Sequence, residues 1–215
     1  MRYITLFSLI PLLFGCNSSN KKSFIPKEFD YPDDSLLKGK TFIYQDIQTG
    51  EKTYTYYRIQ YNLQNKWFLS VQYTNDKVYD STFYLNDKMV ETYSSPYQNG
   101  SLIKCEIIQD TLLQNGTKFG QSSITTVLKQ DSSSVISLLV SEYLKDTTIT
   151  WHSQVIPCVV TTQSCKDEYR NSKDSTTDIL LYSQKGYYGK GIGLIRYTVY
   201  FHDRINTIEL KDIKD

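Results

Sequence analysis

The sequence predicts an all-β fold, a curved antiparallel sheet shaped as a half-barrel or barrel, with little helix. Nineteen tyrosines, together with many Thr, Val and Ile residues, favour extended chain. Turn-forming sequences recur at short intervals, which indicates hairpins and about ten strands, not strands joined by helices. These turn signals are Gln48–Glu51, Asn75–Lys77, Asn86–Lys88, Gln98–Gly100, Asn115-Gly116 and His202–Arg204.

The first fifteen residues differ from the rest of the chain. Arg2 is followed by thirteen uncharged residues, Tyr3 to Gly15, that are rich in Ile, Leu and Phe. A short basic region before an apolar core is typical of a secretory signal peptide. Because a membrane-spanning helix needs about 20 apolar residues, this stretch is too short to remain as one. Residues 1–15 are therefore predicted to be a cleaved signal peptide, and the protein to be exported.

The end of the apolar stretch, Leu13-Phe14-Gly15-Cys16, resembles a bacterial lipobox. The resemblance implies cleavage before Cys16, a diacylglyceryl group on its sulfur and usually an acyl chain on its new amino group. Phe14 is bulkier than the residue that usually stands there. Two or three acyl chains anchor a protein far more firmly than one, so Cys16 is predicted to attach the chain to a membrane.

Residues 16–35 are mostly polar, contain Pro26 and Pro32, and show no periodicity, which predicts a flexible tether. Residues 36–215 are predicted to form a single antiparallel β domain. Removal of residues 1–15 takes away one of the 24 basic residues and none of the 23 acidic residues, leaving a formal charge of zero. A neutral chain does not attract nucleic acid, and none is expected as a partner.

Alternation of side chains predicts which strand faces are buried. On the segment 67–74, Trp67 and Tyr73 share an apolar face with Leu69 and Val71, and the opposite face is mainly polar. The same alternation occurs in 195–201. If the sheet is curved, these apolar faces would line a shared interior, which would either stay hollow and hold an acyl chain or be filled by its own side chains.

Two segments are harder to interpret from pattern alone. Residues 132–145 fit both a Ser-capped helix and a strand, and the β-branched residues Val135, Ile136 and Val140 favour the strand. Residues 166–177 are polar and charged, with Tyr169 as the one aromatic residue, which predicts a long exposed loop.

Four glycines lie within residues 186–193, but the segment does not match a phosphate-binding loop. Lys190 is followed by Gly191 where a P-loop has Ser or Thr, and a strand follows where a nucleotide site has a helix. We therefore predict that Gly191 and Gly193 allow a strand to bend or bulge where the sheet curves.

The segment Tyr188–Arg196 resembles a near-terminal strand of many exported bacterial β-proteins. The resemblance extends over about residues 147–213 of the sequence. In those families the fold resembles the outer-membrane lipoprotein carrier, a half-barrel around an apolar hollow. The resemblance implies this shape and carries no catalytic residues.

Three cysteines remain once Cys16 is lipidated, so at most one disulfide can form among Cys105, Cys158 and Cys165. Cys158 and Cys165 are an odd number of residues apart, and on one strand they would face opposite sides and could not bond. Cys105 has the strand parity of its isoleucine neighbours and is predicted to be buried.

Metal, cofactor and catalytic signatures are weak. The sequence has no Cys-x-x-Cys, and His152 and His202 are its two histidines, neither within a motif. No Gly-x-Ser-x-Gly occurs, and the carboxylates are scattered. No metal or cofactor is expected, and an enzyme is the least favoured class.

The sequence thus predicts a non-catalytic protein, anchored by lipid on Cys16 to the outer membrane and facing the periplasm. Its partner would be an apolar small molecule held in the curved sheet, or an envelope protein. The alternative is a glycan- or protein-binding surface lined by tyrosines. The candidate binding residues are Trp67, Tyr73, Tyr187 and Tyr188. Asn17–Lys22 contains no acidic residue, unlike the surface-export signals of some Gram-negative lineages, which favours the periplasm.

Overall fold

The computed structural model describes residues 25–62, 65–74, 77–85, 88–94, 103–114, 119–128, 134–170 and 175–215, and between 86 and 135 it describes mostly the backbone. Its regular elements are twelve strands preceded by two short helical segments, η1 (Lys27–Phe29) and α1 (Asp33–Leu36). The strands are β1 (Lys40–Asp46), β2 (Lys52–Asn62), β3 (Asn65–Thr74), β4 (Lys77–Leu85), β5 (Lys88–Ser94), β6 (Ile103–Gln114), β7 (Phe119–Leu128), β8 (Ser134–Trp151), β9 (Gln154–Arg170), β10 (Thr177–Gly189), β11 (Gly193–Tyr200) and β12 (Ile205–Lys214).

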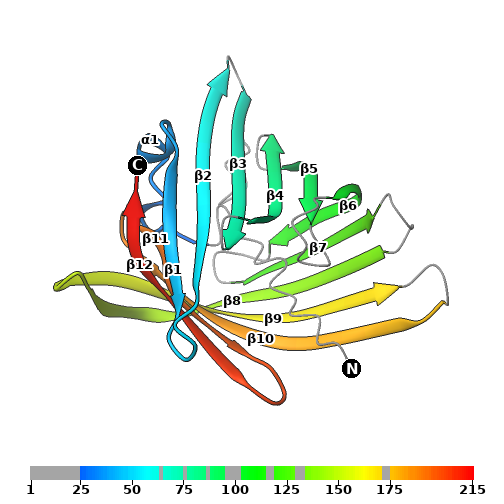
Figure 1. The fold of residues 1–215 in the computed structure, drawn as a ribbon. Coiled ribbons are helices and arrows are strands. Elements are labelled where there is room, and N and C mark those ends of the chain that lie inside the picture. The colour runs from blue at the N-terminus through cyan, green and yellow to red at the C-terminus, as the bar shows by residue number, and fades with distance from the viewer. Residues whose placement is uncertain are drawn as a thin grey trace.

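Each strand pairs antiparallel with its neighbours in sequence, and β1 also pairs with β12, so that the order of ladders closes into a barrel. The β5–β6 ladder is the shortest, running from Thr92↔Cys105 to Ser94↔Ile103. Figure 1 shows strong curvature, with β2–β5 upright and the long strands β8–β10 crossing beneath them. The predicted all-β antiparallel fold with little helix is confirmed.

The turn signals and the strand boundaries agree closely. Each of the six turn sequences falls at the junction of two consecutive strands. The ambiguous segment 132–145 lies largely in β8, as favoured. The predicted loop at 166–177 is wrong in its first part, because β9 continues to Arg170. Lys166 pairs there with Leu138 of β8 and Leu181 of β10, so backbone pairing on both sides overrides the polar composition.

The buried face of β3 is the opposite of the predicted one. Phe68, Ser70 and Gln72 point into the barrel and are buried, whereas Trp67 and Tyr73 point outward and are half-buried. Neighbouring outward side chains shield this apolar row; the ring of Tyr73, for example, is stacked 5.1 Å from that of Tyr54 on β2. The alternation was correctly read, but the face assigned to the interior was wrong.

A β-bulge changes the pattern on β11. Tyr187 pairs with Arg196 and Tyr188 pairs with Leu194, so Ile195 is the extra residue. Leu194 therefore joins the core together with Tyr197 and Val199, while Ile195 lies in a second cluster. The predicted shared face of 195–201 fails at Ile195 for this reason.

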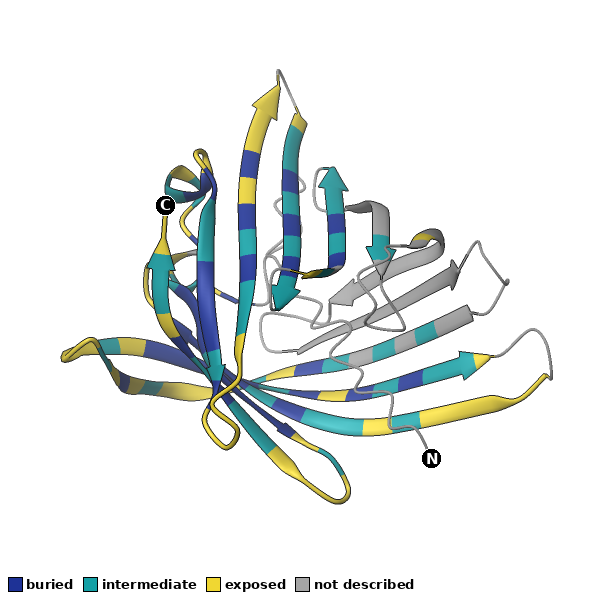
Figure 2. Ribbon diagram, in the orientation of Figure 1, coloured by how far each residue is buried: buried dark blue, intermediate teal, exposed yellow. Residues whose placement is uncertain are grey.

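The segment before β1 is part of the folded domain. Ile25, Tyr31 and Leu36 are buried in the main core cluster. Figure 2 shows buried residues along β1 and where the long strands cross below it. The second half of the predicted tether 16–35 is therefore a plug, which we define as residues 25–36, and a tether can extend no further than residue 24.

The β8–β9 hairpin folds against the outer side of the barrel. Ile149 and Cys158 of the hairpin form the second core cluster with Ile195. At the hairpin tip, His152 and Ser153 have positive φ of 47° and 62°, as in the two-residue turns that match strand twist.

Candidate functional site

The plug closes one end of the barrel through buried tyrosines. The hydroxyl groups of Tyr31 and Tyr44 lie 3.1 Å apart, and the Tyr44 hydroxyl donates to the carbonyl of Leu194 at 3.1 Å. The ring of Tyr31 lies 5.0 Å from those of Phe42 and Tyr57. Burial raises the pKa of Tyr31 and of Tyr44 well above the usual value, so both phenols stay protonated.

The predicted bend glycines lie directly under this plug. Gly191, in the β10–β11 turn, has φ of 71°, and Gly193, at the start of β11, has φ of 91°. A Cβ on Gly193 would lie 2.5 Å from the Tyr31 ring, whereas one on Gly191 would meet nothing within 4 Å. The amide of Gly191 donates to the carbonyl of Glu28 at 2.7 Å. Gly193 thus allows the Tyr31 ring of the plug to pack closely on the barrel, whereas Gly191 provides a positive φ and an amide donor.

The barrel interior becomes polar with distance from the plug. Along β9 the inner row changes from Val159, in the core, to Gln163 and Asp167, which are also buried. The amide of Gln163 donates to the hydroxyl of Ser141 at 2.9 Å, and the amide of Gln184 donates to the side-chain oxygen of Gln163. Such buried polar groups are stable when hydrogen-bonded to each other.

Three further inner groups form a second polar set. Tyr182 is hydrogen-bonded with Cys165 and with Asp167. Burial raises the pKa of the Cys165 thiol to about 12, against the opposing effect of its hydrogen bond with Tyr182. Because the thiolate is the nucleophile, a thiol protonated at neutral pH is not suited to covalent catalysis.

The inner row of β4 contains a buried carboxyl. Asp80 pairs with Gln72 of β3, and its carboxylate accepts a hydrogen bond of 3.3 Å from Thr82. Burial raises the pKa of Asp80 to about 7, although the Thr82 hydrogen bond acts in the opposite direction. The interior around Asp80 is therefore polar and titratable, whereas Phe68 of β3 and Tyr84 of β4 belong to the apolar core.

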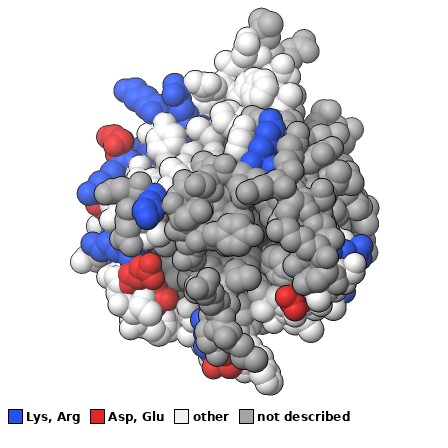
Figure 3. All heavy atoms as spheres, turned by 45° about the vertical axis from the view of Figure 1, so that its right-hand side comes forward, with Lys and Arg blue, Asp and Glu red and all other residues white. Residues whose placement is uncertain are grey.

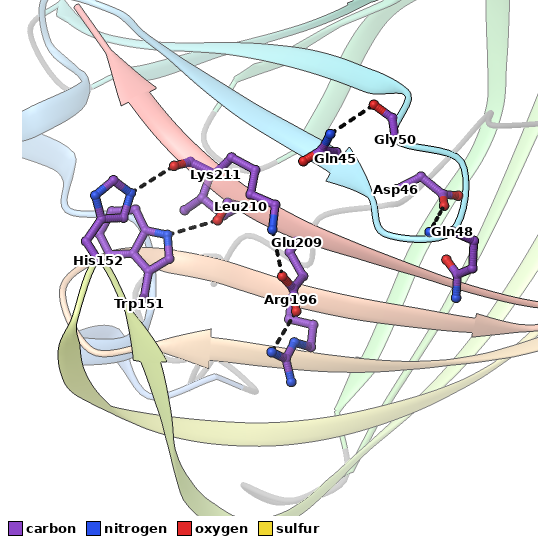
Figure 4. A network of polar contacts seen from close by, with 10 residues as sticks. All are labelled: Gln45, Asp46, Gln48, Gly50, Trp151, His152, Arg196, Glu209, Leu210 and Lys211. Atoms are coloured by element: carbon purple, nitrogen blue, oxygen red, sulfur yellow. Dashed lines mark hydrogen bonds and ion pairs between the residues drawn. The ribbon is translucent and has the colours of Figure 1, made fainter.

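The outer side of β11 and β12 carries an ion-pair network. Glu209 contacts Arg196 at 2.6 Å and Lys211 at 2.9 Å, and Figure 4 shows the three side chains in line across the two strands. Burial acts to raise the pKa of Glu209, but the hydrogen bond from Lys211 and the charge of Arg196 outweigh it and lower the pKa. The Tyr187 ring lies 5.5 Å from the Lys185 ammonium and 5.8 Å from the Arg196 guanidinium.

A similar arrangement occurs on the outer side of β9. Glu168 contacts Arg170 at 2.7 Å and Lys166 at 3.5 Å. The hydrogen bond from Arg170 is the main reason that the pKa of Glu168 is lowered. On this side of the barrel each of these two glutamates is therefore neutralised by two cations.

Exposed apolar side chains form a row next to these charges. Tyr200 pairs with Ser183 of β10 and with Ile205 of β12, and the amide of Ile47 donates to the carbonyl of Thr207 further along β12. We call this row the apolar stripe, and its exposed members are Ile47 (52%), Ile179 (55%), Leu181 (65%), Tyr200 (39%) and Ile205 (55%). The stripe lies at the end of the strands away from the plug.

The four candidate binding aromatics do not form one surface. Trp67 and Tyr73 lie on the outer side of β3, Tyr187 lies on the outer side of β10, and Tyr188 is buried in the core. Strands β11, β12, β1 and β2 separate the two outer positions. Cys16, the predicted lipidation site, lies outside the described residues.

The cysteines have the predicted relationship. Cys158 and Cys165 are both free and buried. Cys158 belongs to the outer cluster, whereas Cys165 lies in the inner row, so the two thiols are on opposite faces of β9. The backbone of Cys105 lies in β6, and its side chain is outside the described set.

Within the described ranges, no group of three or more His, Cys, Asp or Glu side chains is arranged to hold a metal ion. Over the same ranges, no helix has the length and apolar character needed to cross a membrane.

Pattern reading missed both the Arg196–Glu209 pair and the apolar stripe. Each depends on strand register, which places Arg196 opposite Glu209 and Tyr200 opposite Ile205. The run Ile179-Leu180-Leu181, which places apolar side chains on both faces of a strand, was the available signal for the stripe.

No family model matches the chain, and no curated protein matches it. Two solved structures are similar. The first is a "putative lipoprotein" from Parabacteroides distasonis, with 14% identity, a TM-score of 0.55 and coverage of 86% of this chain and 98% of that chain. The second is a "putative exported protein with YmcC-like fold" from Bacteroides fragilis, with 12% identity, a TM-score of 0.46 and coverage of 87% and 98%. The first similarity shows that the fold is shared.

Proposed function

We propose that this chain is a non-catalytic lipoprotein of the bacterial envelope, held on the outer membrane by lipid on Cys16 and facing the periplasm as an interaction module. The observation that carries the proposal is the position of Ile25. It is buried at the plugged end of the barrel, so residues 17–24 alone separate the barrel from Cys16. Such a segment spans at most about 30 Å. The description of the similar Parabacteroides distasonis structure as a lipoprotein supports the same proposal.

A non-catalytic role agrees with the chemistry of the described side chains. The Cys165 thiol is held protonated inside the barrel. The ring of His152 lies at a hairpin tip, 2.8 Å from the carbonyl of Lys211. The two outer glutamates, Glu168 and Glu209, are each ion-paired with two cations.

Binding of an apolar ligand inside the barrel is less well supported than an interaction role. An acyl chain lying along β9 and β10 would meet Gln163, Gln184 and Asp167, which are buried and polar. Desolvating such groups against hydrocarbon is unfavourable. Titration with a fluorescent fatty acid should give no saturable binding; saturable binding at micromolar concentration would restore the ligand-carrier hypothesis.

Membrane fractionation in a native-like host tests the lipid anchor. The parent should remain in the membrane fraction after a high-salt wash, because acyl chains are not released by salt. Cys16→Ala should be released by that wash, and the tether variant Ser18→Ala should behave like the parent. Retention of salt-washed Cys16→Ala on the membrane would contradict the anchor.

Protease treatment of intact cells tests the orientation. A periplasm-facing protein stays whole until the outer membrane is permeabilised. Rapid cleavage in intact cells would contradict the periplasmic orientation and leave the lipid anchor unaffected.

A further inference from the structure

The outer side of β9–β12, which we call the basic wall, carries an excess of positive charge. Its outward acidic residues are Glu168, Glu209 and Asp212. Its outward basic residues are Lys166, Arg170, Lys185, Arg196, Lys211 and Lys214. The whole sequence has a formal net charge of only +1, so this excess is local. Figure 3 shows another view, in which basic and acidic side chains of the described residues are interspersed.

The apolar stripe lies largely on the same wall. Leu181 of β10, Tyr200 of β11 and Ile205 of β12 are all exposed. Contiguous exposed apolar side chains on a water-soluble surface mark a contact with protein or membrane. Apolar and tyrosine side chains beside Lys and Arg are the combination that binds the interface of anionic lipid bilayers.

The chain also enters the core beside this wall. The backbone carbonyl of Glu28, in the plug, accepts a hydrogen bond from the amide of Gly191, and the Glu28 carboxylate lies 3.9 Å from the ammonium of Lys190. Gly191 and Lys190 both belong to the β10–β11 turn. From Gly193 to Tyr200 on β11 the strand rises roughly 23 Å. A tether of residues 17–24, with a reach of about 30 Å, can therefore span the length of β11, so the part of the wall that the β8–β9 hairpin leaves uncovered can lie against the membrane that holds Cys16.

We propose that the basic wall and the apolar stripe dock flat on the anionic phospholipid surface of the anchoring membrane. The proposal deepens the interaction role and rests on the lipid anchor proposed above for its geometry. Anchoring favours membrane over a soluble protein as the occupant, because it holds the wall at high effective concentration beside the lipid. The wall would then orient the barrel, with its β2–β5 side turned away from the membrane.

Vesicle sedimentation of the unlipidated mature chain, carrying Cys16→Ser, tests the docking apart from the anchor. The probes are vesicles of phosphatidylglycerol and phosphatidylethanolamine, with phosphatidylcholine vesicles for comparison. The protein should sediment with the anionic vesicles at low salt and be released at high salt. Lys185→Glu and Leu181→Glu should each weaken binding about fivefold or more.

Two matched variants serve as controls. Arg58→Glu changes an outward charge on β2, and Leu144→Glu changes an exposed apolar residue on β8; neither lies on the wall, and both should bind like the parent. Absence of binding to anionic vesicles, or equal loss in wall and control variants, would overturn the docking. Neither result bears on salt-resistant attachment in cells, which depends on Cys16 alone.

Discussion

The indole Nε1 of Trp151 donates a hydrogen bond of 2.9 Å to the backbone carbonyl of Leu210. The two residues lie on β8 and β12, which are not neighbours in the barrel. The bond, drawn in Figure 4, lies beside Lys211, which is bulged out of the β1–β12 ladder. The hairpin tip thus supplies a donor to a strand whose own pairing is irregular.

Trp151→Phe should reduce the free energy of unfolding by about 1–3 kcal/mol, because the carbonyl of Leu210 loses its donor while a smaller aromatic ring keeps part of the packing. Urea denaturation measures this change. His152→Ala removes the neighbouring contact with the carbonyl of Lys211, which is exposed to water, so it should have a smaller effect. Equal effects of the two variants would show that the indole hydrogen bond is unimportant.

Gly193→Ala should destabilise the protein more than Gly191→Ala. Both residues have positive φ, so both substitutions carry backbone strain of about 1 kcal/mol or more. The Gly193 variant would in addition force the Tyr31 ring away, since its Cβ would approach within 2.5 Å. Thermal or urea unfolding of the two variants separates the cost of backbone strain, which both share, from the cost of displacing the plug. Equal losses of stability in the two variants would argue against close packing of the plug.

Asp80→Asn should remove a pH dependence of stability. The pKa of Asp80 is raised to about 7 by burial, whereas an unfolded chain has about 3.9. Between these values the folded state binds a proton that the unfolded state does not, so parent stability should fall as pH rises through 7. At pH 8 the variant should be more stable by up to a few kcal/mol, and near pH 4 the difference should vanish. Urea denaturation from pH 4 to 8 tests this, and a flat parent profile would show that Asp80 is hydrated.

The thiols of Cys158 and Cys165 should resist modification in the native state. Both are buried, and burial raises the pKa of each. In a Cys16→Ser, Cys105→Ser background, a thiol reagent at pH 8 should react slowly until urea is added. Peptide mapping should show no disulfide between them, since they occupy opposite faces of β9; a Cys158–Cys165 cross-link would contradict the assigned register.

Local pattern located most of the strands, although it missed the end of β9, and it was insufficient for strand faces. Turn sequences and alternation located hairpins correctly, because both are properties of a few adjacent residues. The inward face of β3 depends on its partners: outside, Tyr73 stacks on Tyr54 of β2, and inside, the buried Gln72 pairs with Asp80 of β4. The bulge at Ile195 reverses parity within β11, and no sequence period records it.

The plug and the basic wall were beyond the sequence for different reasons. Ile25, Tyr31 and Leu36 are buried at irregular spacing because the plug has little regular structure. Arg196 and Glu209 meet only through the β11–β12 register. In both cases the deciding contacts join residues from separate elements, which composition and alternation do not reveal.

The ladder between β1 and β12 has a consequence for how the chain folds. It pairs Thr41 with Lys214, near the two ends of the described chain, while the other ladders join consecutive strands. A chain delivered N-terminus first, by ribosome or translocon, therefore holds β1 and the plug without their last partners until β12 emerges. The hairpins can form one after another in sequence order. Pairing β1 with β12 has the largest entropic cost of loop closure, because it joins the two ends of the chain, and this pairing should therefore form last. Until then the outer edges of β1 and β11 remain open to pairing with other chains.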